Sequence, residues 1–258
     1  MNKLTFLGVW MTPDVGETVS FIVDISKGTH VLIDCGTNLV GSMMRCNIDP
    51  MDITHIIVTH SHGDHISGLP TYLFYRFLIA PGILGKEAQK LEIIGSKATI
   101  QSVKEYIKVA YGAMVDNPLI KFVEVNISDM YKIDSAEFHF FATKHQPETV
   151  GFCTNINEKK VVYSADTGIS EEIVSYAKDA DILIHDVVGT SKYSMLSGSH
   201  TLCNEISPLL NKYHVKNFYP VHRLSVYKDD VDEYISELKT EYDGNLVVPN
   251  DGDIISLS

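Results

Sequence analysis

The sequence predicts a layered α/β fold with mixed β-sheets, and three observations predict it. Short apolar runs that end in turn residues recur along the chain, as β-strands do. Helical patterns separate several of these runs in the second half, an alternation typical of α/β proteins. No Gly/Ser linker or low-complexity stretch interrupts the 258 residues, and one α/β domain of this length is ordinary. We therefore expect residues 1–258 to form a single domain.

The expected strands are short and rich in β-branched and aromatic residues. In chain order they are Leu4–Val9, Ser20–Ile25, Val31–Cys35, His55–Thr59, Lys121–Val125, Glu137–Ala142, Val161–Ser164, Ile182–His185, Asn217–Val221 and Ile254–Leu257. The segment VGFCTNINEKKVVYSA, residues 150–165, is expected to hold a pair of strands. Two acidic–glycine steps, in VLIDCGT and VVYSADTG, each follow such a run and hint at a duplicated strand–loop unit.

Helical spacing of apolar residues marks four further segments. They are Lys97–Tyr111, Ser170–Ala177, Thr201–Tyr213 and Lys228–Thr240. Ser170 is the expected N-cap of the second, and the two glutamates that follow it complement the positive end of the helix dipole.

An aromatic-rich segment, LPTYLFYRFLIAPGIL, occupies residues 69–84. The spacing of its rings favours the core of a helix. The alternatives are that some of them stack on a base or form a dimer face, with the loop VAYGAMVDNP reaching the same pocket. The rings are Tyr72, Phe74, Tyr75 and Phe77.

The overall charge restricts the class of partner. The formal net charge is -12, and only three residues are Arg. A protein that grips long nucleic acid needs many phosphate contacts from Lys and Arg, so we expect no such partner. A small anion remains compatible with this charge, because bound metal ions reverse the charge inside a pocket.

Cysteine usage and the N-terminal segment both favour a cytoplasmic protein. No two cysteines form a CxxC pair, and reduced thiols packed in the core are expected. Residues 1–7 lack the length and pattern of a signal peptide, and no apolar run is long enough to span a bilayer. We therefore expect no membrane partner. The cysteines are Cys35, Cys46, Cys153 and Cys203.

The strongest local signal is the segment THSHGDH, which directly follows an expected strand. It places four ligand-type side chains within six positions, namely His60, His62, Asp64 and His65. We expect the first two histidines to face one metal ion and the other two side chains to face a second, with Gly63 allowing a tight backbone. Imidazole and carboxylate together suit zinc, manganese or iron. A solvated polar turn is the alternative, but histidines this close would repel each other when protonated.

Three later residues repeat one arrangement, an apolar strand followed by a ligand-type side chain. His145, Asp166 and His222 each lie at or just past the end of an expected strand. Ligands in α/β sheets collect at the carboxyl ends of strands, so we expect these three to join the same site. Taken singly, each also fits a loop, turn or capping role.

These residues match, in order, the metal-binding pattern of the metallo-β-lactamase superfamily. The chain resembles that superfamily over nearly its whole length, and residues 60–65 correspond to its HxHxDH motif. The resemblance implies a four-layer αβ/βα sandwich with two mixed β-sheets. It also implies two divalent metal ions, by default Zn²⁺, although Mn²⁺ or iron would fit the same ligands. One ion would be held by His60, His62 and His145 and the other by Asp64, His65 and His222, with Asp166 bridging them.

A second resemblance narrows the branch. Asp166 stands where true lactamases usually carry Cys, and the segments ADILIHDVVG and GSHTLC resemble motifs of the tRNase Z branch. By that match His200 would protonate the leaving group, Asp186 would orient it, and a water activated by the two metals would attack. Asp64 is included with these two as a catalytic residue. The alternative is that His200 merely opens a helix and Asp186 merely ends a strand.

Departures from tRNase Z point to a smaller substrate. Asp186 replaces the usual Glu, the Gly-rich start is altered, and the segment from His145 to Asp166 leaves no room for a tRNA-gripping arm. The chain is most similar to phosphodiesterases that open 3′,5′-cyclic nucleotides, among them the phage anti-Pycsar family, which destroys cyclic pyrimidine (cCMP/cUMP) signals. We expect a small nucleotide substrate and a homodimer.

Two other hypotheses stay open. One is a tRNA 3′-processing endoribonuclease, and the other is a non-catalytic nucleotide-binding protein. The remaining histidines are expected to pack, cap or face solvent, and they are His30, His55, His139, His185 and His214.

Overall fold

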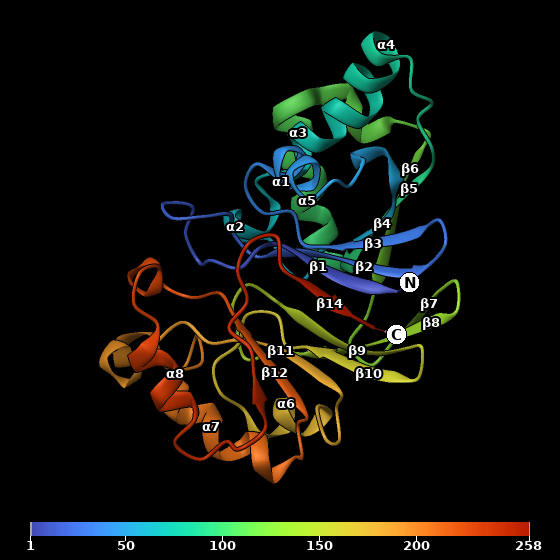
Figure 1. Ribbon diagram of the computed structural model, residues 1–258. Helices are drawn as coiled ribbons and strands as arrows, with labels where there is room; N and C mark the ends of the chain where they lie inside the picture. The colour runs from blue at the N-terminus through green and yellow to red at the C-terminus, as the bar shows by residue number, and fades with distance from the viewer. Residues whose placement is uncertain (1, 258) are drawn as a thin grey trace.

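The computed structural model describes residues 2–257. Two seven-stranded β-sheets pack face to face, and helices cover the outer face of each sheet (Figure 1). The predicted four-layer αβ/βα sandwich is therefore confirmed. Residues 1 and 258, the two ends of the predicted single domain, lie outside the described residues, and the single-domain assignment stays a prediction.

The first sheet comes from the N-terminal half of the chain and one C-terminal strand, in the order β14-β1-β2-β3-β4-β5-β6. Pairing is antiparallel from β14 to β3 and parallel from β3 to β6. Its strands are β1 (Lys3–Gly8), β2 (Ser20–Ser26), β3 (Thr29–Ile33), β4 (Ile53–Ile57), β5 (Leu91–Ser96), β6 (Ile120–Val125) and β14 (Ile254–Ser256).

The second sheet follows in sequence and has the order β13-β12-β11-β10-β9-β8-β7. Pairing is antiparallel from β7 to β10 and parallel from β10 to β13. Its strands are β7 (Met130–Ile133), β8 (Ala136–Ala142), β9 (Val150–Ile156), β10 (Lys159–Tyr163), β11 (Ile182–Asp186), β12 (Asn217–Val221) and β13 (Asn245–Leu246).

The two sheets have the same order of strand pairings when β1–β6 are matched to β8–β13 and the edge strand β14 is matched to β7. Every antiparallel and parallel pairing of one sheet then recurs in the other. Asp34 and Ser164 occupy equivalent positions in the two sheets. The N–H of Asp34 donates to the carbonyl of Ile57 in the neighbouring strand, and the N–H of Ser164 donates in the same way to the carbonyl of Ile184. The duplication indicated by the sequence is present, but its register is offset, because Asp34 corresponds to Ser164 rather than to Asp166.

The main core lies between the sheets. Phe21 from the first sheet meets Tyr163 from the second edge to face, with ring centroids 5.0 Å apart. Two further apolar clusters lie under the outer helices, one on each side. The helices are α1 (Leu39–Arg45), α2 (Gly63–Ile66), α3 (Leu69–Phe74), α4 (Ala80–Leu84), α5 (Lys97–Tyr111), α6 (Glu171–Tyr176), α7 (Cys203–Lys212) and α8 (Asp232–Leu238). Within residues 2–257, none of them has the length and apolarity to cross a bilayer.

The predicted elements agree with the observed ones to different degrees. The helix Lys97–Tyr111 has the predicted bounds, and the hydroxyl of Ser96 caps it by accepting from the N–H of Thr99. Ser170 occupies the predicted N-cap position, but its side chain makes no capping hydrogen bond. The last helix ends at Leu238 and begins only at Asp232, because residues 228–231 form an irregular segment after a 3₁₀ turn at Ser225–Tyr227. The sequence analysis did not identify β5, β7 and β13.

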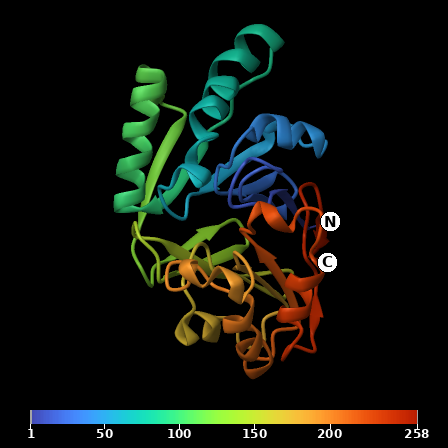
Figure 2. The same cartoon turned by 90° about the vertical axis from the view of Figure 1, so that its left-hand side faces the viewer.

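The aromatic-rich segment forms an arm made of α3, a π-helical turn (Tyr75–Ile79) and α4, which projects beyond the layers (Figures 1 and 2). Tyr72 is fully buried, and its hydroxyl donates to the carbonyl of Pro50, so this ring belongs to the core. Buried Arg76 also donates to that carbonyl and anchors the arm. Phe74 stacks on Tyr111, so the predicted loop does reach the aromatic segment.

Candidate metal centre

The loop that carries four of the predicted ligands, residues 60–65, begins just after β4 ends. The N–H and the hydroxyl of Thr59 donate to the buried carboxylate of Asp34, and they fix the chain just before His60. The backbone then turns into α2, a single helical turn with His62 at its N-cap position. Gly63 has an ordinary backbone conformation, and a side chain there would meet nothing, so the predicted steric need for glycine is wrong. The helical turn itself supplies the compact spacing.

All seven predicted ligands lie at one site, which forms where the two sheets' strand ends meet. The predicted ligands form two groups, one of His60, His62, His145 and Asp166 and the other of Asp64, His65, Asp166 and His222. A third, overlapping group combines Asp166, Asp186, His200 and His222. Within each group the ligand-type atoms lie within 4.8 Å of one another. Their assignment as metal ligands stays a prediction, but the structure brings together every residue on which it depends.

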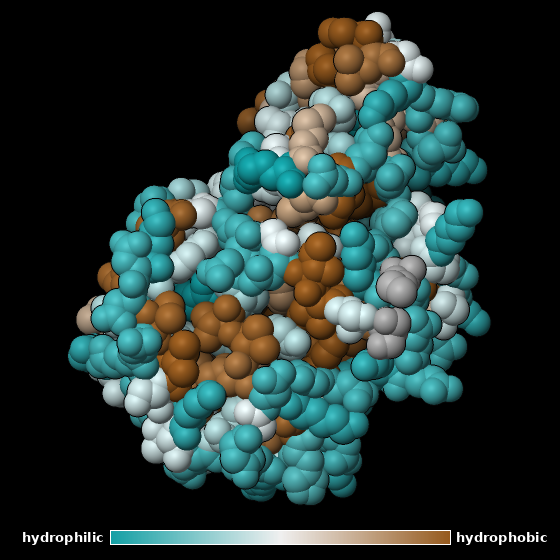
Figure 3. Space-filling model, viewed as in Figure 1, coloured by the Kyte–Doolittle hydropathy of each residue, from teal (hydrophilic) through white to brown (hydrophobic). Residues whose placement is uncertain are grey.

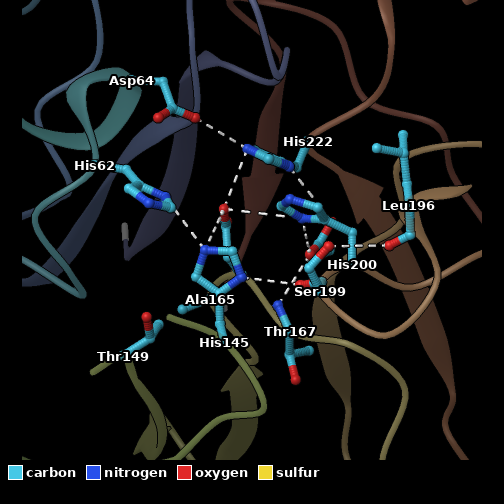
Figure 4. Close-up of polar contacts among 12 residues, drawn as sticks. His62, Asp64, His145, Thr149, Ala165, Thr167, Leu196, Ser199, His200 and His222 are labelled. Atoms are coloured by element: carbon cyan, nitrogen blue, oxygen red, sulfur yellow. Dashed lines mark hydrogen bonds and ion pairs between the residues drawn. The ribbon is translucent and has the colours of Figure 1, made fainter. Parts of the chain in front are cut away.

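The distances within the first group are short. Nδ1 of His62 lies 3.2 Å from Nε2 of His145, and Nε2 of His60 lies 3.7 Å from Oδ2 of Asp166. Figure 4 shows the rings of His62 and His145 pointing toward each other from different loops. Three imidazoles and one carboxylate therefore converge on a single position.

The second group is equally close. Nε2 of His222 lies 3.1 Å from Oδ2 of Asp64 and 3.3 Å from Oδ2 of Asp166. Nε2 of His65 lies 3.2 Å from Oδ1 of the same Asp166. Oδ2 of Asp166 thus faces both groups and Oδ1 faces the second, so this carboxylate is shared, as a bridging ligand requires.

Three of the predicted histidine ligands contact a protein group through Nδ1, the ring nitrogen that does not face the predicted metal position. Nδ1 of His65 lies 2.9 Å from Oδ2 of Asp34, and Nδ1 of His145 donates to the carbonyl of Ser199 at 2.9 Å. Nδ1 of His60 lies 3.1 Å from the hydroxyl of Thr59. A protein partner on one nitrogen leaves the other free to bind a metal, which is the usual arrangement around metal-ligating histidine.

Burial and charge act in opposite directions on these groups. Burial lowers the pKa of His60 well below its ordinary value. It acts in the same direction on His65 and His222, but carboxylates, above all Asp166, outweigh it. The pKa of His65 therefore lies well above its ordinary value, and that of His222 is raised to about 10. Burial also opposes ionisation of Asp166, yet His222 and His65 hold its pKa well below the usual range.

The donor set fits divalent cations. Nε2 of His60, Nε2 of His65 and Oδ2 of Asp166 are buried and have no hydrogen-bond partner among residues 2–257. Leaving such atoms unpaired is costly, and a cation between them would remove that cost. Imidazole nitrogens and carboxylate oxygens are the ligands that zinc, manganese and iron share. Binding would require the histidines to be neutral, so a cation would replace protons.

Asp186 and His200 form a pair beside the two groups. Oδ2 of Asp186 lies 2.9 Å from Nδ1 of His200 and accepts from the N–H of Thr167. Oδ1 of Asp186 lies 3.4 Å from Nδ1 of His222. Both residues are buried, and the pKa of Asp186 is lowered because these two histidines outweigh burial. The pair thus joins the two predicted ligand groups through His222 and Asp166, since Nδ1 of His200 also lies 4.0 Å from Oδ2 of Asp166.

Asp34 is a site residue that was not predicted from the sequence. Its side chain is fully buried and holds both His65 and the start of the ligand loop. Its backbone φ of 57° is a conformation that Asp tolerates better than most residues. The available signal was the acidic residue directly after the apolar run of β3.

The other histidines lie outside the two groups. His30 pairs with Asp24 at 2.6 Å, and His214 lies 3.3 Å from Asp179 near the surface. His185 is fully buried, with Nδ1 donating to the backbone carbonyl of the next residue. His55 is partly buried in β4, and His139 is exposed on β8.

Comparisons with known proteins place this site in context. A family model described as "Anti-Pycsar protein Apyc1" matches residues 3–242. Ribonuclease Z from Haloarcula marismortui is 23% identical, over 97% of this chain and 95% of the relative. Human zinc phosphodiesterase ELAC protein 2 is 32% identical over 64% of this chain and 22% of its own length. The metallo-β-lactamase fold protein YhfI from Bacillus subtilis superposes with a TM-score of 0.84, at 18% identity, covering 99% of this chain and 100% of that one.

Proposed function

From its membership of the anti-Pycsar protein Apyc1 family, to which this chain belongs, we propose that it hydrolyses small 3′,5′-cyclic nucleotides. The broader class is established, since its relatives are metallo-hydrolases of the metallo-β-lactamase fold, within the tRNase Z-like branch. We propose in addition that the site binds two zinc ions and that the pyrimidine signals cCMP and cUMP are among its cyclic substrates.

The seven clustered side chains would hold the cations. His60, His62 and His145 would bind one and Asp64, His65 and His222 the other, with Asp166 shared, as the two groups of side chains allow. Bound there, the cations would activate a water and stabilise charge on the attacked phosphate. Zinc is supported by the name of the human relative, a zinc phosphodiesterase, and by the nitrogen-rich donor set.

The Asp186–His200 pair carries the proposal. When water attacks phosphorus, the bond from phosphorus to the sugar oxygen breaks, and the departing oxygen needs a proton. Nδ1 of His200 is engaged by Asp186 at 2.9 Å, so the opposite nitrogen, Nε2, is free to deliver that proton. The Asp186 carboxylate stabilises the charged ring before transfer and fixes its orientation. This arrangement suits a phosphodiester, whose leaving group is an alkoxide.

A small substrate is supported by what lies around the site. Between His145 and Asp166 the chain forms only β9, β10 and their connections. The cavity that touches His145 has a volume of about 330 Å³, which is near the lower end for small-molecule sites. The net charge of -12 disfavours a long polyanion.

A panel of nucleotides tests the proposal directly. Purified protein is incubated with zinc or manganese and each of the common 3′,5′-cyclic nucleotides, and the monophosphate products are separated chromatographically. We expect turnover of at least the pyrimidine cyclic nucleotides and its loss in His200→Ala. Precursor tRNA runs in parallel. Efficient cleavage of the tRNA with all cyclic nucleotides intact would reject the proposal.

Ribonuclease activity is the second candidate, because the Haloarcula ribonuclease Z aligns along nearly the whole of both chains. It predicts that a tRNA with a 3′ extension is cut at one position. In the absence of a tRNA-gripping arm between β9 and β10, we rank it below cyclic-nucleotide hydrolysis.

We further propose that the chain forms a homodimer. The tip of the arm exposes apolar side chains, with Ile83 exposed by 73% and Leu84 by 53%, and Figure 3 shows hydrophobic residues gathered over α4. Phe74 and Phe77 beneath this tip line an apolar cavity of about 450 Å³, which no predicted metal ligand lines. Light scattering coupled to size exclusion gives the mass, and a monomer at micromolar concentration would reject this assembly.

A further inference from the structure

The cavity beside His145 is built from the two loops that carry the chemistry. It is lined by Thr143, Lys144, His145, Gln146, Gly198 and Ser199. One of these loops carries a predicted metal ligand, and the other leads directly into His200. A molecule in this cavity would therefore contact His145 and the residues that directly precede His200.

Main-chain hydrogen bonds fix the backbone of Lys144 in place. Its N–H donates to the hydroxyl of Thr167 at 3.1 Å, and its carbonyl accepts from the N–H of Gly168 at 2.9 Å. Both partners belong to the loop that follows Asp166. The Lys144 side chain thus starts from a fixed point, one residue from His145 and beside the loop that follows Asp166.

Lys144 is also the only lining residue of this cavity with a permanent positive charge. Within residues 2–257 its exposed side chain has no hydrogen-bond or ion-pair partner, whereas the carboxylates of the site, at Asp34, Asp64, Asp166 and Asp186, each pair with histidines. A second cavity of about 370 Å³ shares Lys144 and Thr143 with the first, so this segment lines both.

We propose that this cavity is the substrate subsite and that Lys144 is its anion-binding residue, which holds the phosphate of a small nucleotide while the metal centre attacks. The inference rests on the proposed function and adds a specificity-determining residue to it. An ammonium that binds the phosphate throughout the reaction strengthens substrate and transition-state binding alike, so its effect falls on KM more than on kcat.

The test compares Lys144→Gln with Lys27→Gln. Lys27 lies in the turn between β2 and β3, at the end of these strands away from the metal centre, and its loss changes the net charge equally. We expect KM for the cyclic nucleotide to rise about tenfold in Lys144→Gln, the loss of one charge-assisted contact, with kcat within about twofold. Lys144→Arg should recover part of the loss, and Lys27→Gln should behave as wild type.

Equilibrium binding gives a readout that does not depend on turnover. Calorimetric titration with uridine 5′-monophosphate, with metal present, is expected to show about tenfold weaker binding in Lys144→Gln than in Lys27→Gln. Equal affinities in the two variants, or a loss confined to kcat, would overturn the role of Lys144. A wild-type protein that binds the monophosphate through Lys144 but hydrolyses no cyclic nucleotide would reject the proposed function and leave this inference standing.

Discussion

The two sheets share one topology but distribute their functional side chains differently. In the first, four ligand-type residues follow a single strand, β4, within one short loop. In the second they are spread over the ends of β8, β10, β11 and β12, one or two residues at a time. One half of the site is therefore dense and recognisable as a sequence motif, and the other half is dispersed along the chain and is brought together only by folding.

The equivalent positions Asp34 and Ser164 show how the halves diverged. Asp34 accepts from the N–H of Thr59, and Ser164 accepts through its hydroxyl from the N–H of Asp186 in the matching place. The carboxylate of Asp34 extends on to His65. In the second half the serine hydroxyl contacts only the backbone, and Asp186 itself contacts His200. Both positions therefore accept the equivalent backbone N–H, but the carboxylate that contacts a histidine is Asp34, after β3, in the first half and Asp186, at the end of β11, in the second.

The largest expected effect comes from the dense half. Replacing both His62 and Asp64 with Ala removes one ligand from each group and should reduce hydrolysis of any phosphodiester to background. The measurement is kcat/KM with bis(p-nitrophenyl) phosphate. Exposed His139→Ala is the matched control and should keep full activity. Turnover that survives the double substitution would place the active site elsewhere.

The dispersed half is tested by His200→Ala. Loss of a proton donor should lower kcat by about 10²- to 10⁴-fold on a cyclic nucleotide. A p-nitrophenyl ester has a leaving group that needs little protonation, so its hydrolysis should fall much less. Equal losses on both substrates would mean that His200 positions the substrate instead of protonating the leaving oxygen.

Asp34→Asn and Ser164→Ala compare the equivalent positions directly. Asn keeps the shape of Asp34 but removes the charge that holds His65, and metal affinity should fall by about 10- to 100-fold. Ser164→Ala loses two backbone hydrogen bonds, one from the N–H of Asp186 and one to the carbonyl of Ala165, so it should lower stability by about 2 kcal/mol and leave metal affinity unchanged. Competition with a chromophoric chelator measures the affinities. Similar metal affinities in both variants would refute the asymmetry.

The smallest expected effect compares two equivalent antiparallel hairpins, β2–β3 in the first sheet and β9–β10 in the second. In β2–β3, Asp24 stands opposite His30, and its hydrogen bond raises the histidine pKa against partial burial. Because the folded pKa is raised, the pair stabilises below about pH 6.5, and the contribution disappears as pH rises through the folded value. His30→Gln should cost about 0.5 kcal/mol at about pH 5.5 and nothing at about pH 9, measured by urea unfolding. An equal cost at both pH values would contradict this. The matching pair in β9–β10, Asn155 and Lys160, lacks a titrating group in this range and should show no such dependence.

The dense half and most strands could be predicted from the sequence, because clustered ligands and alternating apolar runs are local signals. The grouping of His145, Asp166 and His222 came from their places after strands and from the family resemblance. Asp34 was missed because its role depends on Thr59 and His65, which only the parallel pairing of β3 and β4 brings near. The short edge strands β7 and β13 were missed because few of their residues are buried.

Counting the metal ions tests the central claim most directly. Inductively coupled plasma mass spectrometry of protein freed of loosely bound metal should give two ions per chain for the wild type and for His200→Ala, which lies outside both predicted ligand sets. Asp166→Ala should fall well below two, because Asp166 belongs to both groups. An active wild-type protein without stoichiometric metal, or an Asp166→Ala variant that still holds two ions, would contradict the account.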